Sequence, residues 1–226
     1  MTDAAAAPLP LSRTERAALA DLLADVGPDA PTRCAGWTTR HLAAHLVVRD
    51  RRPDAMPGMA VGGPLGRWSE RVMDRVRLET DWVPLVARVR SGPPAFLPTA
   101  WPALDRVLNT AEMVIHHEDV RRAQPDWAPR ELPRPVQDQL WASVPLMARG
   151  GGVPRTAGGL VVRRSDVPDG SPGSERRLRD GEPTTTVIGA PLEVLLWLSG
   201  RPDVACVDLT VEPPPTGQSA TGSASL

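Results

Sequence analysis

The chain has 226 residues and carries 26 basic and 27 acidic side chains, for a net charge of −1. Lysine and tyrosine are both absent, which excludes Schiff-base enzymes, phosphate-binding loops that need a lysine, and catalysis by a phenol. The balanced charge argues against nucleic acid or an anionic membrane as a partner, and it leaves four histidines, the carboxylates, two cysteines and the hydroxyls for chemistry.

Apolar residues at helical spacing predict that the first part of the chain is helical. The expected helices span 12–26, 39–50, 67–80 with 81–90, 103–123 and 135–149. Ser12 and Glu15 form a predicted capping box, and Thr38 and Thr39 are suited to cap the second helix. The stretch 57–66, rich in glycine and proline, predicts a loop.

The pattern changes after the glycines at 150–152. Short β-branched or alternating segments predict strands at 160–164, 175–179, 184–188 and 204–211, with a helix at 191–198. The last residues are almost free of large apolar side chains, which predicts disorder. We therefore expect an α+β chain with a helical domain over 1–150, a small α+β domain over 151–212 and a disordered tail over 213–226.

The two cysteines, Cys34 and Cys206, are too far apart in sequence for a disulfide framework, which fits a reducing cytoplasm. The opening MTDAAAAPLPL places an aspartate where a secretory leader would be basic, and no apolar run is long enough to span a membrane. We expect a soluble cytoplasmic protein. Cys34 precedes the second helix, where it is either a reactive thiol or a small buried side chain.

The segment 109–123 concentrates ionisable groups on one predicted helix. Glu112 and His116 are four residues apart, so both side chains can reach one point in space. His45 on the second helix is a natural third ligand, and two imidazoles with one carboxylate suit a divalent metal such as zinc with a position open for water or substrate. Asp119 is placed to hydrogen-bond a ligating imidazole.

Spacing alone leaves alternatives open. A polar strip beside an apolar helix face is commonly a solvated surface, and Glu-x-x-x-His occurs on helices by chance. His41 and His45 form a competing pair with the same spacing, and His117 points about 100° away from His116.

Three stretches of the sequence carry a resemblance to a known family. They are CAGWTTRHLAAHLVVRD at 34–50, AEMVIHHEDVRRA at 111–123 and TVIGAPLEVLLWLSGR at 186–201. Together they resemble the actinobacterial mycothiol-dependent maleylpyruvate isomerase family over most of residues 12–210. The resemblance implies an N-terminal DinB-like bundle of the four-helix type, joined to the small C-terminal α+β domain.

The family pattern places its metal ligands on His45, Glu112 and His116, which implies that His41 and His117 are not primary ligands. It also implies mycothiol as a cofactor, held as a thiolate by the metal. In the implied reaction the thiolate adds to a cis double bond, the resulting single bond rotates, and elimination leaves the trans product. Thiol transfer to a small electrophile is the related possibility.

An anionic substrate requires cationic side chains, and arginine binds carboxylates through two parallel hydrogen bonds. Arg201, in the C-terminal motif, is the candidate that the second domain contributes. The arginines at helix ends are expected to interact with helix dipoles and solvent; they are Arg49, Arg51, Arg52, Arg121 and Arg122.

Two rival functions use the same metal. In a zinc-dependent hydrolase, metal-bound water replaces the thiol and Asp119 acts as the base. In a metal-binding or sensing protein without catalysis, His41 or His117 supplies a fourth ligand and closes the site.

Overall fold

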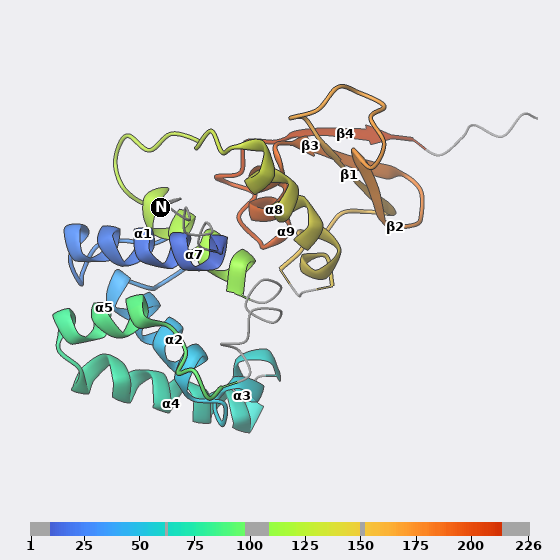
Figure 1. Ribbon diagram of the computed structural model, residues 1–226. Helices are drawn as coiled ribbons and strands as arrows, with labels where there is room; N and C mark the ends of the chain where they lie inside the picture. Colours follow the sequence, from blue (N-terminus) through green and yellow to red (C-terminus); the bar gives the residue numbers. More distant parts are fainter. Residues whose placement is uncertain (1–9, 62, 98–108, 150–151, 214–226) are drawn as a thin grey trace, which may run out of the picture. The chain divides into compact units, whose positions relative to one another are not determined.

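The computed structural model describes residues 10–61, 63–97, 109–149 and 152–213, and within them the chain forms helices and one β-sheet (Figure 1). The chain divides into two compact units, Met1–Val136 and Gln137–Leu226, called unit 1 and unit 2 below. The described part of unit 1 is helical, whereas unit 2 combines helices with a four-stranded sheet. The predicted α+β class is therefore confirmed.

Among the described residues, the helices of unit 1 enclose a large apolar core and a smaller separate cluster of Val48, Ala55 and Val72. They are α1 (Leu11–Val26), α2 (Thr39–Arg51), α3 (Met56–Val61), α4 (Gly63–Glu79), α5 (Trp82–Ser91) and α7 (Thr110–Arg121). Helix α1 packs against α5 and α7, and α2 packs against α4 and α5. The core includes the fully buried side chains of Leu19, Leu42, Leu46, Leu85 and Met113. Residues 103–108 of the predicted fourth helix lie outside the described ranges.

Charged side chains also join α1 to α7. His117 Nδ1 lies 2.7 Å from Glu15 Oε2, and Arg130 donates to both oxygens of the same carboxylate at 3.0 and 3.1 Å. Glu118 is fully buried and forms ion pairs with Arg121, Arg122 and Arg130. We call this group the α1–α7 ion cluster. Burial of charged groups at this density requires that each be paired.

The predicted capping box at Ser12 is wrong, because Ser12 lies inside the helix and not at its N-cap position. Helix α1 begins at Leu11, its N-cap Pro10 makes no side-chain capping bond, and the carboxylate of Glu15 belongs to the cluster instead. The expectation for the helix-end arginines also fails at Arg122, whose side chain is fully buried, is paired with Glu118 and lies over the ring of Trp127.

The loop predicted for residues 57–66 is wrong, because α3 and α4 occupy the described part of this stretch. A Cβ atom at Gly58 would lie 2.0 Å from the carbonyl oxygen of Leu65 and 2.2 Å from Ser69 Oγ. The missing side chain is thus what allows α3 to lie directly on α4. Packing here outweighs the low helix propensity of glycine.

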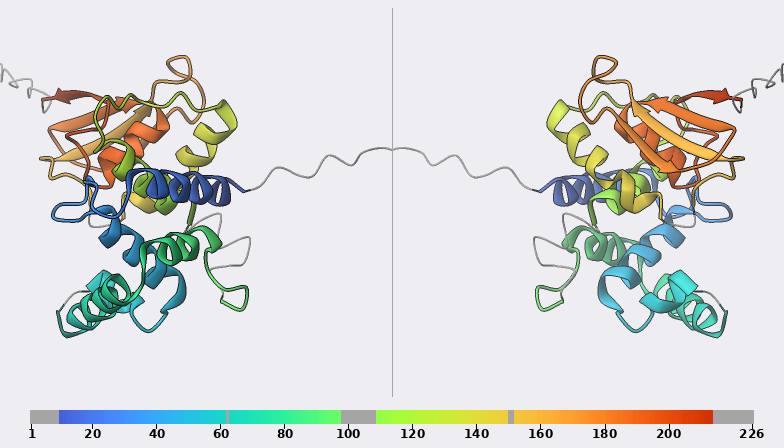
Figure 2. Two further views of the ribbon diagram at one scale, coloured as in Figure 1. Left: turned by 90° about the vertical axis from the view of Figure 1, so that its left-hand side faces the viewer. Right: turned by 90° about the vertical axis from the view of Figure 1, so that its right-hand side faces the viewer.

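Unit 2 contains one sheet with strand order β2-β1-β3-β4. The strands are β1 (Gly159–Arg164), β2 (Glu175–Arg179), β3 (Thr184–Gly189) and β4 (Asp208–Glu212). The two central strands, β1 and β3, run parallel and are mostly buried, and each pairs antiparallel with an edge strand. Helix α9 (Pro191–Leu198) packs against β1 and β3 (Figure 2). All eight of its residues are buried.

The last strand starts later than predicted. A turn ends at residue 204, and residues 205–207 form no regular secondary structure; Ala205 N donates to the carbonyl of Arg201 and Cys206 N donates to Glu193 Oε2. These bonds keep the segment out of the sheet until Asp208. Of the predicted tail at 213–226, all but residue 213 lies outside the described ranges.

The division between the units falls at the start of α8 (Arg134–Met147), whereas the sequence predicts a boundary near residue 150. Contacts of α8 with unit 2 account for the difference: the side-chain oxygen of Gln137 accepts the backbone N–H of Leu192, and the Trp141 indole donates to the carbonyl of Gly173. Within the described ranges, every helix is too short or too polar to cross a membrane.

Candidate metal centre

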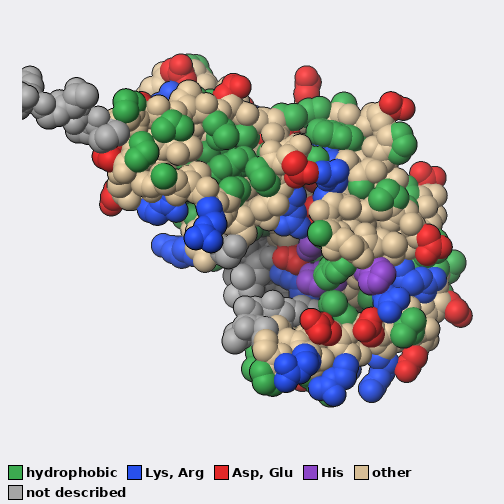
Figure 3. Space-filling model, turned by 180° about the vertical axis from the view of Figure 1, so that it is seen from behind, with side chains coloured by type: hydrophobic (Ala, Val, Ile, Leu, Met, Phe, Trp, Pro, Cys, Tyr) green, Lys and Arg blue, Asp and Glu red, His purple; other side chains and the backbone are tan. Residues whose placement is uncertain are grey.

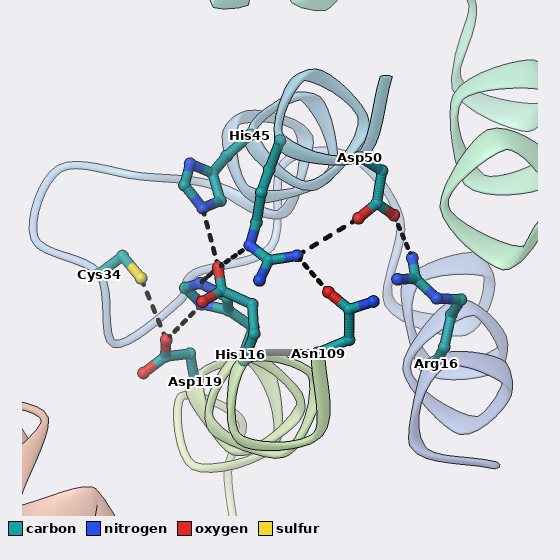
Figure 4. Close-up of polar contacts among 9 residues, drawn as sticks. Arg16, Cys34, His45, Asp50, Asn109, His116 and Asp119 are labelled. Atoms are coloured by element: carbon teal, nitrogen blue, oxygen red, sulfur yellow. Dashed lines mark hydrogen bonds and ion pairs between the residues drawn. The ribbon is translucent and has the colours of Figure 1, made fainter. Parts of the chain in front are cut away.

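Three predicted ligands converge in unit 1. His45 Nε2, from α2, lies 3.3 Å from Glu112 Oε1, and His116 Nε2, one turn after Glu112 on α7, lies 3.2 Å from the same oxygen. Dashed lines in Figure 4 mark these contacts of His45 and His116. The three donor atoms all lie within 4.8 Å of one another, as ligands of one ion would.

The polar face of α7 is not a solvated surface. Asn109 is fully buried, Asp119 is 1% exposed and His116 is 8% exposed. Burial of this strip is costly unless each group has a partner, so the partners define what the strip does. Where histidines reach the surface, acidic and basic side chains lie beside them (Figure 3).

Asp119 holds His116 from the side away from Glu112. Its Oδ2 lies 2.8 Å from His116 Nδ1 and also accepts the thiol of Cys34 at 3.2 Å. Arg33 N donates to the carbonyl of Asp119, which fixes the loop carrying Cys34 against α7. A hydrogen bond at Nδ1 directs the lone pair of Nε2 toward the position between the three donors. Cys34, Asp119 and His116 form a second group of residues whose donor atoms have ligand-like spacing.

The other two histidines have structural partners. His41 Nδ1 accepts the backbone N–H of Thr38 and so caps the start of α2. His117 belongs to the α1–α7 ion cluster through Glu15. Neither residue is in a described donor group with His45, Glu112 and His116.

The electrostatics of the site stabilise positive charge at the three donors, for which a proton on His116 and a metal ion would compete. Burial lowers the pKa of His45, which therefore stays neutral near pH 7. Burial alone would raise the pKa of Glu112, but hydrogen bonds with His116 and His45 hold it well below its usual range. Burial opposes charge on His116, yet hydrogen bonds with Asp119, Cys34 and Glu112 raise its pKa well above the ordinary value. A proton on His116 thus occupies a site at which positive charge is stabilised.

Arg49 is a further member of the site that spacing did not single out. It follows His45 by one helical turn, and its Nε lies 3.2 Å from Glu112 Oε1. Its NH1 atom donates to Asn109 Oδ1 at 2.7 Å and lies 3.4 Å from Asp50 Oδ1. The expectation of a solvated helix-end charge is wrong for Arg49, whose side chain is 11% exposed. The sequence offered one signal for a polar partner here: Asn109, the single asparagine of the chain, lies on the same helix face as Glu112.

A cavity of about 390 Å³ opens beside His45 in unit 1. Its wall includes Trp37, Gly58, Gly66, Ser69, Glu70 and Met73, from α3, α4 and the loop before α2. The ring of Trp37 lies 5.3 Å from the imidazole of His45, centroid to centroid. The cavity gives a small molecule a place next to one of the three donors.

Arg201 belongs to unit 2 and follows α9. Its guanidinium donates to the carbonyl of Ser199, two residues earlier. Its assignment to the active site stays a prediction.

The donor set fits a divalent metal. Two imidazole nitrogens and one carboxylate oxygen form a three-ligand set typical of catalytic zinc, and such sets keep a position for water or substrate. The described part of the chain thus combines an α+β fold with a candidate metal site in its helical unit.

No protein-family model matches the chain, and no curated protein matches it either. Among solved structures, the chain is similar to a histidine-to-alanine mutant of the mycothiol-dependent maleylpyruvate isomerase. The match has a TM-score of 0.55 and 16% identity, and it covers 91% of this chain and 97% of that chain. A structure of the mycothiol-dependent maleylpyruvate isomerase matches over the same shares with 18% identity and a TM-score of 0.48. The first similarity establishes a likeness of fold.

Proposed function

We propose that the chain is a thiol-dependent metalloenzyme with an activity like that of the mycothiol-dependent maleylpyruvate isomerase. In this proposal unit 1 is a DinB-like helical bundle that holds a divalent metal, zinc first, through His45, Glu112 and His116. The observation that carries it is the convergence of both Nε2 atoms on Glu112 Oε1, at 3.3 and 3.2 Å. The likeness of fold to that isomerase supports the choice of thiol chemistry.

The metal, when bound, supplies a positive centre with an open position that stabilises a thiolate near neutral pH. The chain's own residues do the remaining work. Asp119 holds the tautomer of His116 through Nδ1, and burial keeps His45 neutral and able to coordinate. The cavity beside His45 receives part of the thiol or of the substrate.

The proposed reaction is cis–trans isomerisation of a small anionic electrophile, or transfer of the thiol to it, with mycothiol as the thiol. A lysine nucleophile is absent from the sequence, and the described site places Cys34 against Asp119. A nucleophile supplied by the cofactor is consistent with both observations. Arg201 remains the proposed contribution of unit 2 to substrate binding.

Metal content tests the ligand assignment. We expect the purified protein to bind about one equivalent of zinc or a similar metal, and His45→Ala and His116→Ala to lose most of it. His41→Ala, on the same helix as His45, is the matched control and should retain its metal because its partner is Thr38. Full metal retention in both His45→Ala and His116→Ala would contradict the assignment.

Turnover tests the reaction. Maleylpyruvate and other cis-unsaturated acids are assayed with the metal-loaded protein, with and without mycothiol. We expect activity only when mycothiol is present. Equal activity without thiol would remove this mechanism and favour hydrolysis by metal-bound water.

The two rival functions have less support. Hydrolysis requires Asp119 as a base, but its carboxylate is engaged by His116 and Cys34. A closed structural site requires His41 or His117, and both have other partners among the described residues.

A further inference from the structure

We propose that Arg49 is the anion-binding residue of the metal site. When a ligand occupies the open coordination position of the metal, Arg49 binds a carboxylate of that ligand. The inference rests on the proposed function for the presence of the metal. It adds the residue that recognises the ligand. It also adds the chemical class of the ligand, a molecule with a carboxylate next to its metal-binding atom.

The first observation is that Arg49 already binds a carboxylate at this place. Its Nε lies 3.2 Å from Glu112 Oε1, the oxygen on which His45 and His116 converge. Arginine therefore forms part of the wall around the position that a metal would occupy. Guanidinium groups bind carboxylates more strongly than neutral donors do, and with defined geometry.

The second observation is that Arg49 is held rigidly. Its NH1 atom donates to Asn109 Oδ1 at 2.7 Å, and the same atom lies 3.4 Å from Asp50 Oδ1. Asp50 is itself buried and lies 2.5 Å from Arg16 (Figure 4). Arg16 also donates to the carbonyl of Val89. Rigid placement reduces the entropy that a side chain loses on binding a ligand.

The third observation concerns charge. A divalent cation exceeds the charge of Glu112 by one, and Arg49 adds another positive charge. Asp50 is balanced by Arg16, and Asp119 offsets one charge from the far side of His116. The loaded site therefore remains positive and attracts an anion to the open position.

The cavity beside His45 does not serve this purpose. Among the described residues that line it, none is an arginine, His45 is one of the three proposed metal ligands, and Glu70 is acidic. A carboxylate is disfavoured there, whereas an uncharged part of the ligand is not. The charged group of the ligand is thus expected to face Arg49.

The test compares Arg49→Gln with Arg52→Gln, a control at the end of the same helix whose guanidinium pairs with the exposed Asp54. Zinc affinity is measured first, by competition with a chromophoric chelator. Removing a positive charge beside the metal should tighten zinc binding in Arg49→Gln and leave Arg52→Gln unchanged. Weaker zinc binding in Arg49→Gln would mean that Arg49 only orients Glu112, and would overturn the proposal.

Ligand recognition is measured on the cobalt(II)-substituted proteins by visible spectroscopy. Mercaptoacetate and 2-mercaptoethanol both offer a thiol, but only the first carries a carboxylate. Wild type and Arg52→Gln should bind mercaptoacetate about tenfold more tightly than 2-mercaptoethanol. Arg49→Gln should lose this preference and bind 2-mercaptoethanol with the affinity of wild type. An unchanged preference in Arg49→Gln would refute the role of Arg49.

Two further results have defined meanings. If neither thiol alters the cobalt spectrum, the thiol part of the proposed function fails, and maleate then tests Arg49 alone: equal affinity in wild type and Arg49→Gln overturns the proposal. If Arg49→Gln does not fold, Arg49→Lys replaces it. Lysine carries its charge on a single nitrogen and cannot contact Glu112, Asn109 and a ligand carboxylate together as a guanidinium can, so the preference should fall several-fold, and full retention overturns the proposal.

Discussion

Replacement of Asp119 by alanine tests how far the proposed metal site depends on residues that do not touch the ion. The change removes the hydrogen bond between Asp119 Oδ2 and His116 Nδ1, 2.8 Å long, together with the acceptor of the Cys34 thiol. His116 then loses the partner that fixes its tautomer and ring orientation. Zinc binding should weaken as a result, although all three ligands remain.

The structure sets the size of the effect. The Asp119 side chain has no exposed surface, so water replaces the lost acceptor poorly. Partners of this kind typically contribute about 10- to 100-fold to metal affinity. At about 1.4 kcal/mol per factor of ten, Asp119→Ala should cost about 1.4–2.8 kcal/mol of zinc binding free energy.

The assay is zinc competition with a chromophoric chelator at two pH values. Asp119 contributes to the raised pKa of His116, so protons compete with zinc more strongly in wild type than in the variant as the pH falls. The deficit of Asp119→Ala should therefore be larger at alkaline pH than at neutral pH. Asp74→Ala, which removes an exposed carboxylate on α4, is the control. Wild-type zinc affinity in Asp119→Ala at alkaline pH would refute the reasoning.

Two predictions concern the fold that carries the site. Glu15→Gln should lower the free energy of unfolding at pH 7 by about 1.5–3 kcal/mol, because charge-assisted bonds to His117 and Arg130 are lost. Burial alone would raise the pKa of Glu15, but these bonds outweigh burial and lower the pKa below the ordinary glutamate value. The stabilisation is therefore present above the ordinary glutamate pKa and is lost as the pH falls through the lowered pKa, so Glu15→Gln should lose less stability in acid than wild type. Equal acid sensitivity of the two proteins in denaturant titrations would count against the cluster. Gly58→Ala should lower the free energy of unfolding by about 1–3 kcal/mol, because its Cβ atom would meet the Leu65 carbonyl. Gly66→Ala, whose Cβ atom would have its nearest contact at 3.6 Å, should be neutral or stabilising. Similar unfolding midpoints for the two variants would show that α3 and α4 separate easily.

The sequence predicts that His45, Glu112 and His116 lie together better than it predicts what surrounds them. The helical period alone places Glu112 and His116 together, because that relation is local. The choice of His45 over His41 required the family resemblance, because the two histidines lie four residues apart on one helix and their spacing does not rank them. Only contacts with residues distant in the sequence distinguish their roles. The structure places the first beside Glu112 and the second on Thr38.

Arg49 and the segment 57–66 show why the remainder was not predictable. The sequence does not distinguish a helix-end arginine that faces water from one that faces a buried carboxylate. For Arg49 the environment depends on where α7 lies. Glycines at 58 and 66 predict a loop by local propensity, yet helix formation there follows from the close packing of α3 on α4. Both failures occur where tertiary contacts outweigh local preference.

The neighbouring histidines of α7 have a consequence for how the chain tolerates change. His116 serves the proposed metal site and His117 serves the ion cluster with Glu15, about 100° further around the helix axis. A deletion or insertion of one residue before this pair would turn both histidines away from their partners at once. Two independent sets of contacts thus lock the rotation of α7, and lengthening or shortening of the chain should be tolerated only outside this helix.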